Sequence, residues 1–474
     1  MEHQSLPPNG RTEADVLEDL QSFAAQDPKY KEGRLWSLVY HLDEGHDAFL
    51  SKAYAQFSSA NGLNPSVFQS VKQMETEVIS IVAGLLNGGP DSCGVMTAGG
   101  TESCLMAVKT YRDLARKTRK VRRPNMILAE TAHVAWFKAS EYFGVKVKLL
   151  PIGKDHRPDL RKLPKLINSN TVMVLGSAPE YPFGLIDPIE EMAEIAQGQD
   201  VPMHVDACVG GFILPFMEMN GTVMPPWDFR VPGVTSISAD VHKYGYAAKG
   251  ASTITYRDLD TLKHQMFVYE DWPGGIFASP ALLGTRPGGA YAAAWATLQK
   301  IGTEGYRELA RQTSDAVEQL RQGIEAIEGL VVIGDPKGPL IAYRSNDKDL
   351  NIFAVAAQME LAGWSLNRTQ KPDGIHAMVT AQHLAVVPEY LADLRKSVDI
   401  VRSNPRLANS GSSATYGMMS HVPLRGMVKK RVLDVFAEMY RAGGAKLDLH
   451  ASGSPSLLER GMSRYVAWRA KRSR

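Results

Sequence analysis

The stretch Ser236-Ile-Ser-Ala-Asp-Val-His-Lys-Tyr-Gly-Tyr-Ala-Ala-Lys-Gly250 places a lysine between two predicted strands. Residues 236–239 have the character of a buried or half-buried strand, and Ser252-Thr-Ile-Thr-Tyr256 predicts the next one. Lysine is almost never fully buried without a partner or a chemical role. Lys243 is therefore either a nucleophilic amine in a tight link or a surface lysine on a hairpin. In the first case, burial beside other cations would lower the pKa of the amine and populate its neutral form.

Strand-like and helical segments alternate along the chain that leads to this stretch. The alternation predicts an α/β lobe with a mainly parallel sheet. Ligands of such sheets bind at the carboxyl ends of the strands. His133, Asp206 and Lys243 each follow a strand-like run, so one cleft could gather them. The predicted strands are residues 126–129, 145–150, 171–175, 202–207 and 235–238.

A glycine pair precedes a long predicted helix in Gly94-Val-Met-Thr-Ala-Gly-Gly-Thr-Glu-Ser103. Gly99 and Gly100 allow the backbone to approach a ligand closely. Thr101 stands at the start of the helix, where free backbone N–H groups and the helix dipole favour an anion. The segment is therefore either a phosphate site or an ordinary Gly-Thr helix start.

Asp206 and His133 complete a possible cofactor site. A carboxylate at the end of a strand can keep a pyridine nitrogen protonated, and the protonated ring accepts electrons. The plainer alternatives are an aspartate N-cap and a structural histidine. Taken with the glycine pair and Lys243, these residues match the parts that pyridoxal 5'-phosphate needs, namely a phosphate cradle, a ring cover, a nitrogen partner and an amine.

Composition excludes several other classes of protein. The 474 residues are 44% hydrophobic and 22% charged, with a formal net charge of +2, so nucleic acid is not an expected partner. The three cysteines, Cys93, Cys104 and Cys208, are too few and too scattered for a disulfide framework or a zinc site, and we expect no metal and a cytoplasmic location. No apolar run approaches the ~20 residues of a membrane span, and the start has no signal-peptide core.

Three parts are predicted along the chain. Residues 1–60 form an N-terminal arm with helices, residues 61–303 the large cofactor-binding α/β domain, and residues 304–474 a smaller α+β domain. A basic tail follows residue 460, and we expect either a solvated end or a weak attraction to anionic lipid. Its cations are Arg464, Arg469, Lys471, Arg472 and Arg474.

Several of these motifs together resemble the sphingosine-1-phosphate lyase family. They are GGTES, HVDACVGGF, SISADVHKYGYAAKG and GTRPGG, with LNGGPDSCG at residues 86–94 and Tyr416-Gly-Met418. The resemblance extends from about Tyr40 to about Met418. It implies the fold-type I (aspartate aminotransferase-like) architecture of pyridoxal-phosphate enzymes, related to the group II amino-acid decarboxylases, with a smaller α+β C-terminal domain.

The resemblance also implies roles for individual residues. Lys243 would be the Schiff-base lysine, Asp206 the partner of the pyridinium nitrogen and His133 the residue stacked on the ring. The cofactor phosphate would be held by Gly100, Thr101 and His242, and by Thr285 of the other subunit, which implies a homodimer with shared active sites. Tyr40, Tyr181 and Lys249 would lie near the substrate phosphate.

One position departs from the family pattern. Asn64 stands where the family often has a histidine; asparagine can donate a hydrogen bond but carries no charge, which puts phosphate affinity or its pH dependence in doubt. The family's eukaryotic members also carry an N-terminal membrane span, for which this chain has no matching apolar run.

The implied reaction is a retro-aldol cleavage of a phosphorylated sphingoid base to a long-chain aldehyde and phosphoethanolamine. The general base stays open between the substrate phosphate, Lys243 and a tyrosine. An amino-acid decarboxylase is the main alternative, and a catalytically silent binding protein on the same fold is the other. Lys249 favours the lyase, because an anionic headgroup needs a fixed cation.

Overall fold

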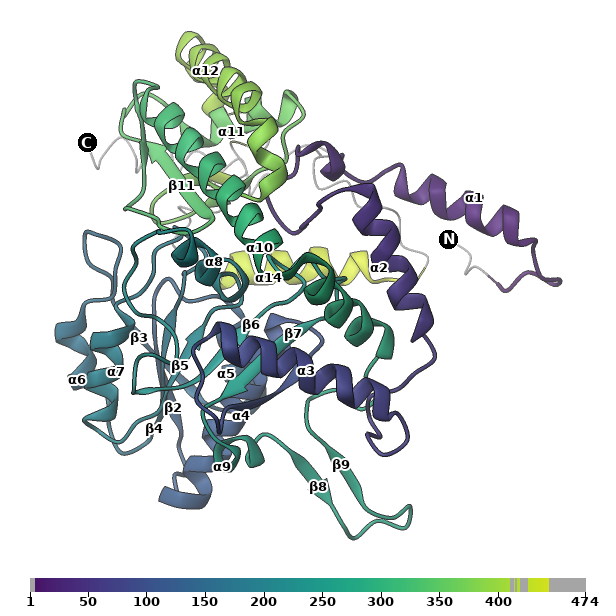
Figure 1. The fold of residues 1–474 in the computed structure, drawn as a ribbon. Coiled ribbons are helices and arrows are strands. Elements are labelled where there is room, and N and C mark those ends of the chain that lie inside the picture. Colours follow the sequence, from purple (N-terminus) through teal and green to yellow (C-terminus); the bar gives the residue numbers. More distant parts are fainter. Residues whose placement is uncertain (1–4, 410–412, 414–415, 418–424, 443–474) are drawn as a thin grey trace.

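A seven-stranded sheet lies at the centre of the larger domain (Figure 1). The computed structural model describes residues 5–409, 413, 416–417 and 425–442. The strand order is β1-β7-β6-β5-β4-β2-β3, and β7 runs antiparallel to both of its neighbours while the remaining pairs are parallel. The strands are β1 (Cys93–Thr97), β2 (Asn125–Ala129), β3 (Lys146–Leu150), β4 (Thr171–Ser177), β5 (Met203–Asp206), β6 (Val234–Ala239) and β7 (Ser252–Tyr256). The predicted α/β architecture with a mainly parallel sheet is confirmed.

Helices cover both faces of this sheet because its strands are apolar on both sides. In β2, Met126 and Leu128 belong to the apolar cluster under α4 and α5, whereas Ile127 belongs to the cluster on the opposite face. The helices of this domain are α3 (Gln69–Leu85), α4 (Gly100–Arg119), α5 (Ala135–Phe143), α6 (Leu163–Leu166), α7 (Ile189–Gln197), α8 (Leu214–Met219) and α9 (Leu259–Lys263). A separate antiparallel hairpin extends from it, formed by β8 (Phe267–Tyr269), which is exposed, and β9 (Phe277–Ser279), which ends at the buried Ser279.

The smaller domain is built on a four-stranded antiparallel sheet in the order β10-β11-β13-β12. Its elements are β10 (Leu330–Val332), β11 (Leu340–Ser345), α11 (Ile352–Leu361), β12 (Asn367–Thr369), β13 (Gly374–Met378) and α12 (Val387–Ser403), followed by α14 (Arg425–Met439). The long helix α10 (Gly288–Glu325) contributes buried residues to the cores of both domains. Gly302 interrupts α10 with a φ of 62°, a left-handed conformation that suits glycine. The boundary expected between residues 303 and 304 falls directly after this interruption.

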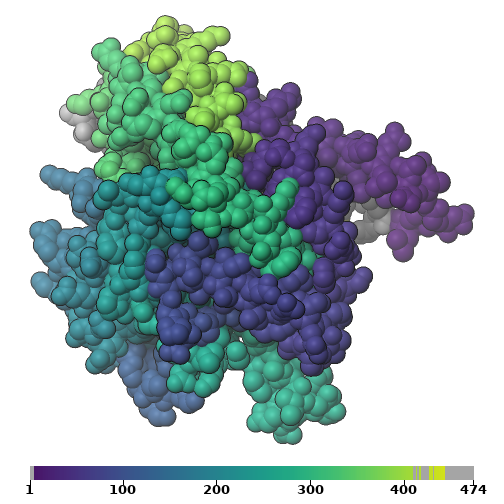
Figure 2. Space-filling view, in the orientation of Figure 1, coloured from purple at the N-terminus to yellow at the C-terminus, as the bar shows by residue number. Residues whose placement is uncertain are grey.

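The N-terminal arm packs on the rest of the molecule, and its Trp36 is fully buried in the core of the smaller domain. Helix α2 (Glu44–Gln56) packs on α10, and His46 Nε2 lies 2.9 Å from the carbonyl oxygen of Tyr246. Helix α1 (Glu13–Ala24) has no buried residue and projects from the body as the purple segment in Figure 2. None of the helices in the described part of the chain combines the length and apolar character that crossing a membrane requires. The basic tail after residue 460 lies outside the described residues.

A buried ion pair fastens α3 to the start of α10. Arg286 Nη1 lies 2.8 Å from Glu75 Oε1, and both side chains are at most 5% exposed. The same guanidinium donates to the Tyr291 hydroxyl at 2.8 Å and to the carbonyl oxygen of Gly62 at 2.5 Å. Four segments of the larger domain therefore meet at one cation.

We predict that Arg286→Met lowers the free energy of unfolding by about 3–5 kcal/mol, because it leaves the Glu75 carboxylate buried without its charge partner. Chemical denaturation followed by circular dichroism measures the change. The matched control is Arg307→Met, whose partner Glu304 is exposed and whose loss should cost less than about 1 kcal/mol. Equal losses in the two variants would contradict a structural role for the buried pair.

Candidate active site

A cavity of about 610 Å³ opens at the carboxyl ends of the parallel strands. Its lining comes from the start of α4, the end of β5 and the link between β6 and β7, which lie far apart in the sequence. The prediction that one cleft gathers His133, Asp206 and Lys243 is therefore confirmed. The lining includes Gly99, Gly100, Thr101, His133, Tyr181, Asp206, Asp240, His242, Lys243 and Lys249.

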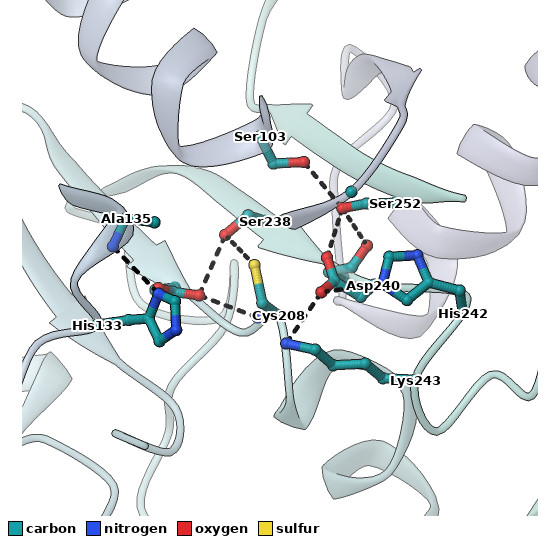
Figure 3. A network of polar contacts seen from close by, with 12 residues as sticks. Ser103, His133, Ala135, Cys208, Ser238, Asp240, His242, Lys243 and Ser252 are labelled. Carbon is teal, nitrogen blue, oxygen red and sulfur yellow. Dashed lines mark hydrogen bonds and ion pairs between the residues drawn. The ribbon is translucent and has the colours of Figure 1, made fainter. Parts of the chain in front are cut away.

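Lys243 lies in the link between β6 and β7, as expected, but its electrostatic environment differs from the prediction. Its Nζ lies 3.0 Å from a carboxylate oxygen of Asp240, toward which the side chain points in Figure 3. Burial alone would lower the pKa of Lys243, yet the negative charge of Asp240 outweighs burial and raises the pKa well above its usual value. The expectation of a lowered pKa is wrong because sequence inspection assigned no role to Asp240.

Asp206 ends β5 with its carboxylate enclosed by donors. Oδ2 accepts a hydrogen bond from Trp136 Nε1 at 2.9 Å, and Oδ1 accepts one from the backbone N–H of Cys208 at 3.1 Å. Burial would raise the pKa of this carboxyl, but the hydrogen-bond donors around it hold the pKa below its usual value. Asp206 is therefore an anion at neutral pH, as a partner of a protonated ring nitrogen must be.

His133 follows the strand β2 and stands beside Tyr181. Its Nδ1 accepts a hydrogen bond from the backbone N–H of Ala135 at 3.2 Å, and its ring meets Tyr181 edge to face at a centroid distance of 5.8 Å. Burial lowers the pKa of His133 although Asp206 opposes this shift. A neutral imidazole held at the side of the cavity is suited to stacking on an aromatic ligand.

The first turn of α4 forms a close-fitting cradle. A Cβ on Gly100 would stand 2.7 Å from Asp240 Oδ2 and 2.9 Å from Cys208 Sγ, so only glycine fits there. Thr101 and His242 also border the cavity. Glu102 joins the cradle to the segment after β9, because it accepts hydrogen bonds from the backbone N–H groups of Ala98 at 2.7 Å and Leu282 at 2.9 Å.

Two cysteines that are 104 positions apart in the sequence meet beside Asp206. Cys104 Sγ, Cys208 Sγ and an Asp206 oxygen all lie within 4.8 Å of one another. Burial raises the pKa of Cys104 to about 11, so its thiol stays protonated at neutral pH. The spacing of the cysteines in the sequence concealed this cluster, which adds weak S–H donors to the carboxylate.

Lys249 and Tyr40 form the outer side of the site. Lys249 Nζ lies 4.8 Å from the centroid of the Tyr40 ring and donates to the carbonyl oxygen of Leu38 at 2.9 Å. Lys249 is exposed at the mouth of the cavity, yet partial burial of its ammonium, followed by the positive charge of Lys243, lowers its pKa to about 8. The Tyr40 hydroxyl lies 2.8 Å from Met378 Sδ on β13, so the smaller domain also contacts the site.

Tyr40 is not among the residues that line this cavity but contacts Lys249, which is. Two further predicted residues, Asn64 and Thr285, do not line it either. Both are exposed. Asn64 Oδ1 accepts hydrogen bonds from the backbone N–H and the hydroxyl of Ser66, and Thr285 Oγ1 lies 3.4 Å from Asn61 Nδ2. Within a single chain the structure does not bring these two residues to the other site residues.

Asp240 and Glu102 were not recognised in the sequence as parts of the site. Asp240 directly follows β6 and Asp206 is the last residue of β5, and this similar position at a strand end was the signal that could have identified Asp240. Glu102 gave no comparable signal, because its carboxylate accepts a hydrogen bond from the backbone of Leu282, which is 180 residues away in the sequence.

The lining fits pyridoxal phosphate. The glycine cradle leaves room at a helix N-terminus for a phosphate. An anionic carboxylate, a neutral imidazole and an amine face the same cavity. These are the groups that a pyridinium nitrogen, an aromatic ring and an aldehyde require.

Comparison with known proteins agrees with this chemistry. Residues 59–346 match the model of the pyridoxal-dependent decarboxylase conserved domain. The chain is 44% identical to sphingosine-1-phosphate lyase from Oryza sativa, over 88% of this chain and 79% of that protein. It is 41% identical to sphingosine-1-phosphate lyase 1 from Rattus norvegicus, over 95% of this chain and 80% of that protein.

Solved structures give the same result. The structure of sphingosine-1-phosphate lyase from Burkholderia pseudomallei superposes with a TM-score of 0.83 at 36% identity, covering 91% of this chain and 97% of that one. Glutamate decarboxylase from Lactobacillus brevis shares the fold, with a TM-score of 0.74 at 20% identity, covering 85% of this chain and 96% of that one. The chain belongs to the pyridoxal-dependent decarboxylase family and, within it, to the sphingosine-1-phosphate lyases, which are pyridoxal-phosphate enzymes.

Proposed function

We propose that this protein cleaves phosphorylated sphingoid bases, with sphingosine 1-phosphate as the representative substrate, to a long-chain aldehyde and phosphoethanolamine. The observation that carries the proposal is a cation of the cavity other than Lys243, namely Lys249. Lys249 lies near Lys243 and beside Tyr40, so one end of the cavity offers a positive charge that cofactor chemistry does not itself use. A substrate phosphate supplies a matching anion.

The chemistry divides between the cofactor and the chain. Pyridoxal phosphate supplies, when bound, an aldehyde that holds an amine and a ring that accepts an electron pair. Lys243 would hold the aldehyde through its amine. Asp206, held anionic by Trp136 and the Cys208 backbone, would stabilise positive charge on the ring nitrogen.

Proton transfer at the substrate C3 hydroxyl is assigned to Lys243 Nζ. Burial raises the pKa of Tyr40 far above its usual value and also raises that of Tyr181, so both phenols keep their protons and act as hydrogen-bond donors. Lys243 Nζ, held 3.0 Å from a carboxylate oxygen of Asp240, would be the proton acceptor when its amine is free. Loss of the C3 hydroxyl proton and cleavage of the C2–C3 bond release the aldehyde, and a proton returned to C2 completes phosphoethanolamine.

The proposal includes a homodimer with shared sites. Thr285 and Asn64 are exposed and lie away from the cavity of their own chain, so a second copy is the means by which they would reach a cofactor or substrate phosphate. A reducing, cytoplasmic location is also part of the proposal, supported by the free thiols of Cys93, Cys104 and Cys208.

A product assay tests the activity directly. The protein loaded with pyridoxal phosphate is incubated with sphingosine 1-phosphate, and mass spectrometry measures the long-chain aldehyde and phosphoethanolamine. We expect both in equal amounts. If neither forms while the cofactor remains bound, the substrate assignment is wrong, and release of carbon dioxide from a panel of amino acids then tests the decarboxylase alternative.

Replacing the proposed amine should stop the reaction. We predict that Lys243→Ala abolishes product formation and the visible absorbance of lysine-bound cofactor, because it removes the amine that is proposed to hold the aldehyde. The control is Lys263→Ala, which removes an exposed lysine paired with Asp260 and should leave both readouts unchanged. Turnover retained in Lys243→Ala would remove this lysine from the mechanism.

Replacing Lys249 should affect phosphorylated substrates selectively. We predict that Lys249→Ala lowers kcat/KM about 10- to 100-fold for sphingosine 1-phosphate, the loss of one charge-assisted hydrogen bond, and lowers it much less for a non-phosphorylated amine. Steady-state kinetics with both substrates measures the difference. Equal losses would argue against a headgroup role for Lys249.

The same residue predicts a pH dependence. Lys249 has a pKa of about 8 and is charged below that value, so the kcat/KM of the wild-type protein for sphingosine 1-phosphate should fall as pH rises through about 8. Lys249→Arg stays charged there and should lose this component of the decline. A pH profile identical in the two proteins would contradict the assignment.

A further inference from the structure

A second cavity, of about 380 Å³, lies at the amino ends of parallel strands of the central sheet. It borders α4 and the residues that begin β4, β5 and β6, whereas the active site lies where parallel strands end. Its lining includes Arg119, Val172 and Pro202, together with the polar side chains of Tyr111 and Thr235. Neither polar side chain has a part in the reaction described above.

A continuous chain of hydrogen-bonding groups leads from this cavity to Asp206. The Tyr111 hydroxyl lies 2.5 Å from Ser236 Oγ, which lies 2.7 Å from His204 Nδ1. His204 Nε2 lies 3.2 Å from Ser238 Oγ, and Ser238 Oγ donates to Asp206 Oδ1 at 3.4 Å. Five side chains thus connect the amino ends of the parallel strands with their carboxyl ends.

The register of the sheet produces this alignment. His204 pairs with Ser236, and Asp206 pairs with Ser238, across the neighbouring parallel strands β5 and β6. Residues two apart on a strand share a face, so all four side chains lie on the face covered by α4. Helix α4 adds Tyr111 to the same face, and the intervening Val205 and Ile237 enter the apolar core on the other side.

Proton accounting gives the chain a single direction. Asp206 is anionic and can only accept, so Ser238 donates to it and must accept from His204 Nε2–H. Burial lowers the pKa of His204 to about 4, so the imidazole is neutral, with one N–H and one acceptor nitrogen. Its Nδ1 therefore accepts from Ser236, and Ser236 accepts from Tyr111. In this arrangement the donor bonds between Tyr111 and Asp206 all point toward Asp206, while the Thr235 hydroxyl donates to the carbonyl oxygen of Met203 at 2.9 Å and the Cys208 thiol donates to Ser238 Oγ at 3.3 Å.

The interior of this chain is closed to solvent, while its outer end is not. His204, Ser236 and Ser238 are 0% exposed. Tyr111 Oη also lies 2.6 Å from the hydroxyl of Thr235, which is half-buried at the second cavity. Tyr111 and Thr235 both line the second cavity, so the outer end of the chain borders a space that water can reach.

We propose that Tyr111, Ser236, His204 and Ser238 form a proton path that connects Asp206, and through it the ring nitrogen of the cofactor, with water in the second cavity. The proposal rests on the role of Asp206 given under the proposed function. A proton taken from cavity water at Tyr111 shifts each successive proton by one bond and delivers one to Asp206. The reverse transfer returns it, so that no net charge accumulates.

Such a path would carry protons to Asp206 while ligands fill the active-site cavity. Cofactor and a long-chain substrate would occupy the active-site cavity, whereas the second cavity lies outside it and borders a different set of residues. The proton between Asp206 and the ring nitrogen could then exchange while substrate is bound. A purely static support for Asp206 would need the Ser238 hydroxyl alone and would not need Tyr111.

The test measures exchange of the ring-nitrogen proton in the holoenzyme. The protein is loaded with pyridoxal phosphate labelled with ¹⁵N in the ring, and NMR follows the N–H signal after transfer to D2O. We expect Tyr111→Phe and Ser236→Ala each to slow exchange at least 10-fold while the ¹⁵N chemical shift changes little. The matched control is Tyr256→Phe, which removes a buried hydroxyl bonded to Thr110 and Gln265 instead and should leave the rate unchanged.

Two results would overturn the proposal. An unchanged exchange rate in both Tyr111→Phe and Ser236→Ala, in proteins with normal circular dichroism and bound cofactor, leaves only a static role for these residues. A slowing of the same size in Tyr256→Phe assigns the effect to general loosening of the core. The Asp206→Asn variant tests the role of Asp206 separately from the proton path. An unaltered ¹⁵N shift in that variant would show that Asp206 is not the partner of the ring nitrogen.

Discussion

The pairing of Asp240 with Lys243 is the constraint around which the active site is arranged. A buried ammonium or carboxylate alone would be expensive, and each is tolerated here because the other lies 3.0 Å away. Asp240 also excludes any side chain at Gly100, since a Cβ would stand 2.7 Å from its oxygen. One carboxylate therefore sets the charge of the amine and the shape of the phosphate cradle.

Helix α4 joins most of the functional features of the larger domain. Its first turn forms the cradle, Glu102 holds the segment after β9, Cys104 approaches Asp206 and Tyr111 reaches the second cavity. Gly100, Cys104 and Tyr111 lie along one side of the helix, and Cys104 and Tyr111 belong to the apolar cluster between the helix and the sheet, whereas Glu102 lies on another side. The helix is thus fixed by packing along its length and not only by the ligand at its end.

Much of this organisation could be predicted from the sequence. The alternation of strands and helices predicted the α/β sheet, and the polar residues after strands predicted which side chains meet. What could not be predicted depends on register and on distant contacts. The pairing of His204 with Ser236, the meeting of Cys104 with Cys208 and the high pKa of Lys243 all arise from neighbours that no local pattern specifies.

The antiparallel direction of β7 has a consequence for how the lysine is presented. A parallel successor to β6 would require a long crossover, whereas β7 returns at once, so residues 240–251 form a loop clamped at both ends within one sheet. Such a loop has few conformations left to lose when a ligand arrives. The conformational entropy of the loop that carries the reactive amine is lost during folding. Ligand binding therefore needs little further loss of entropy from this segment.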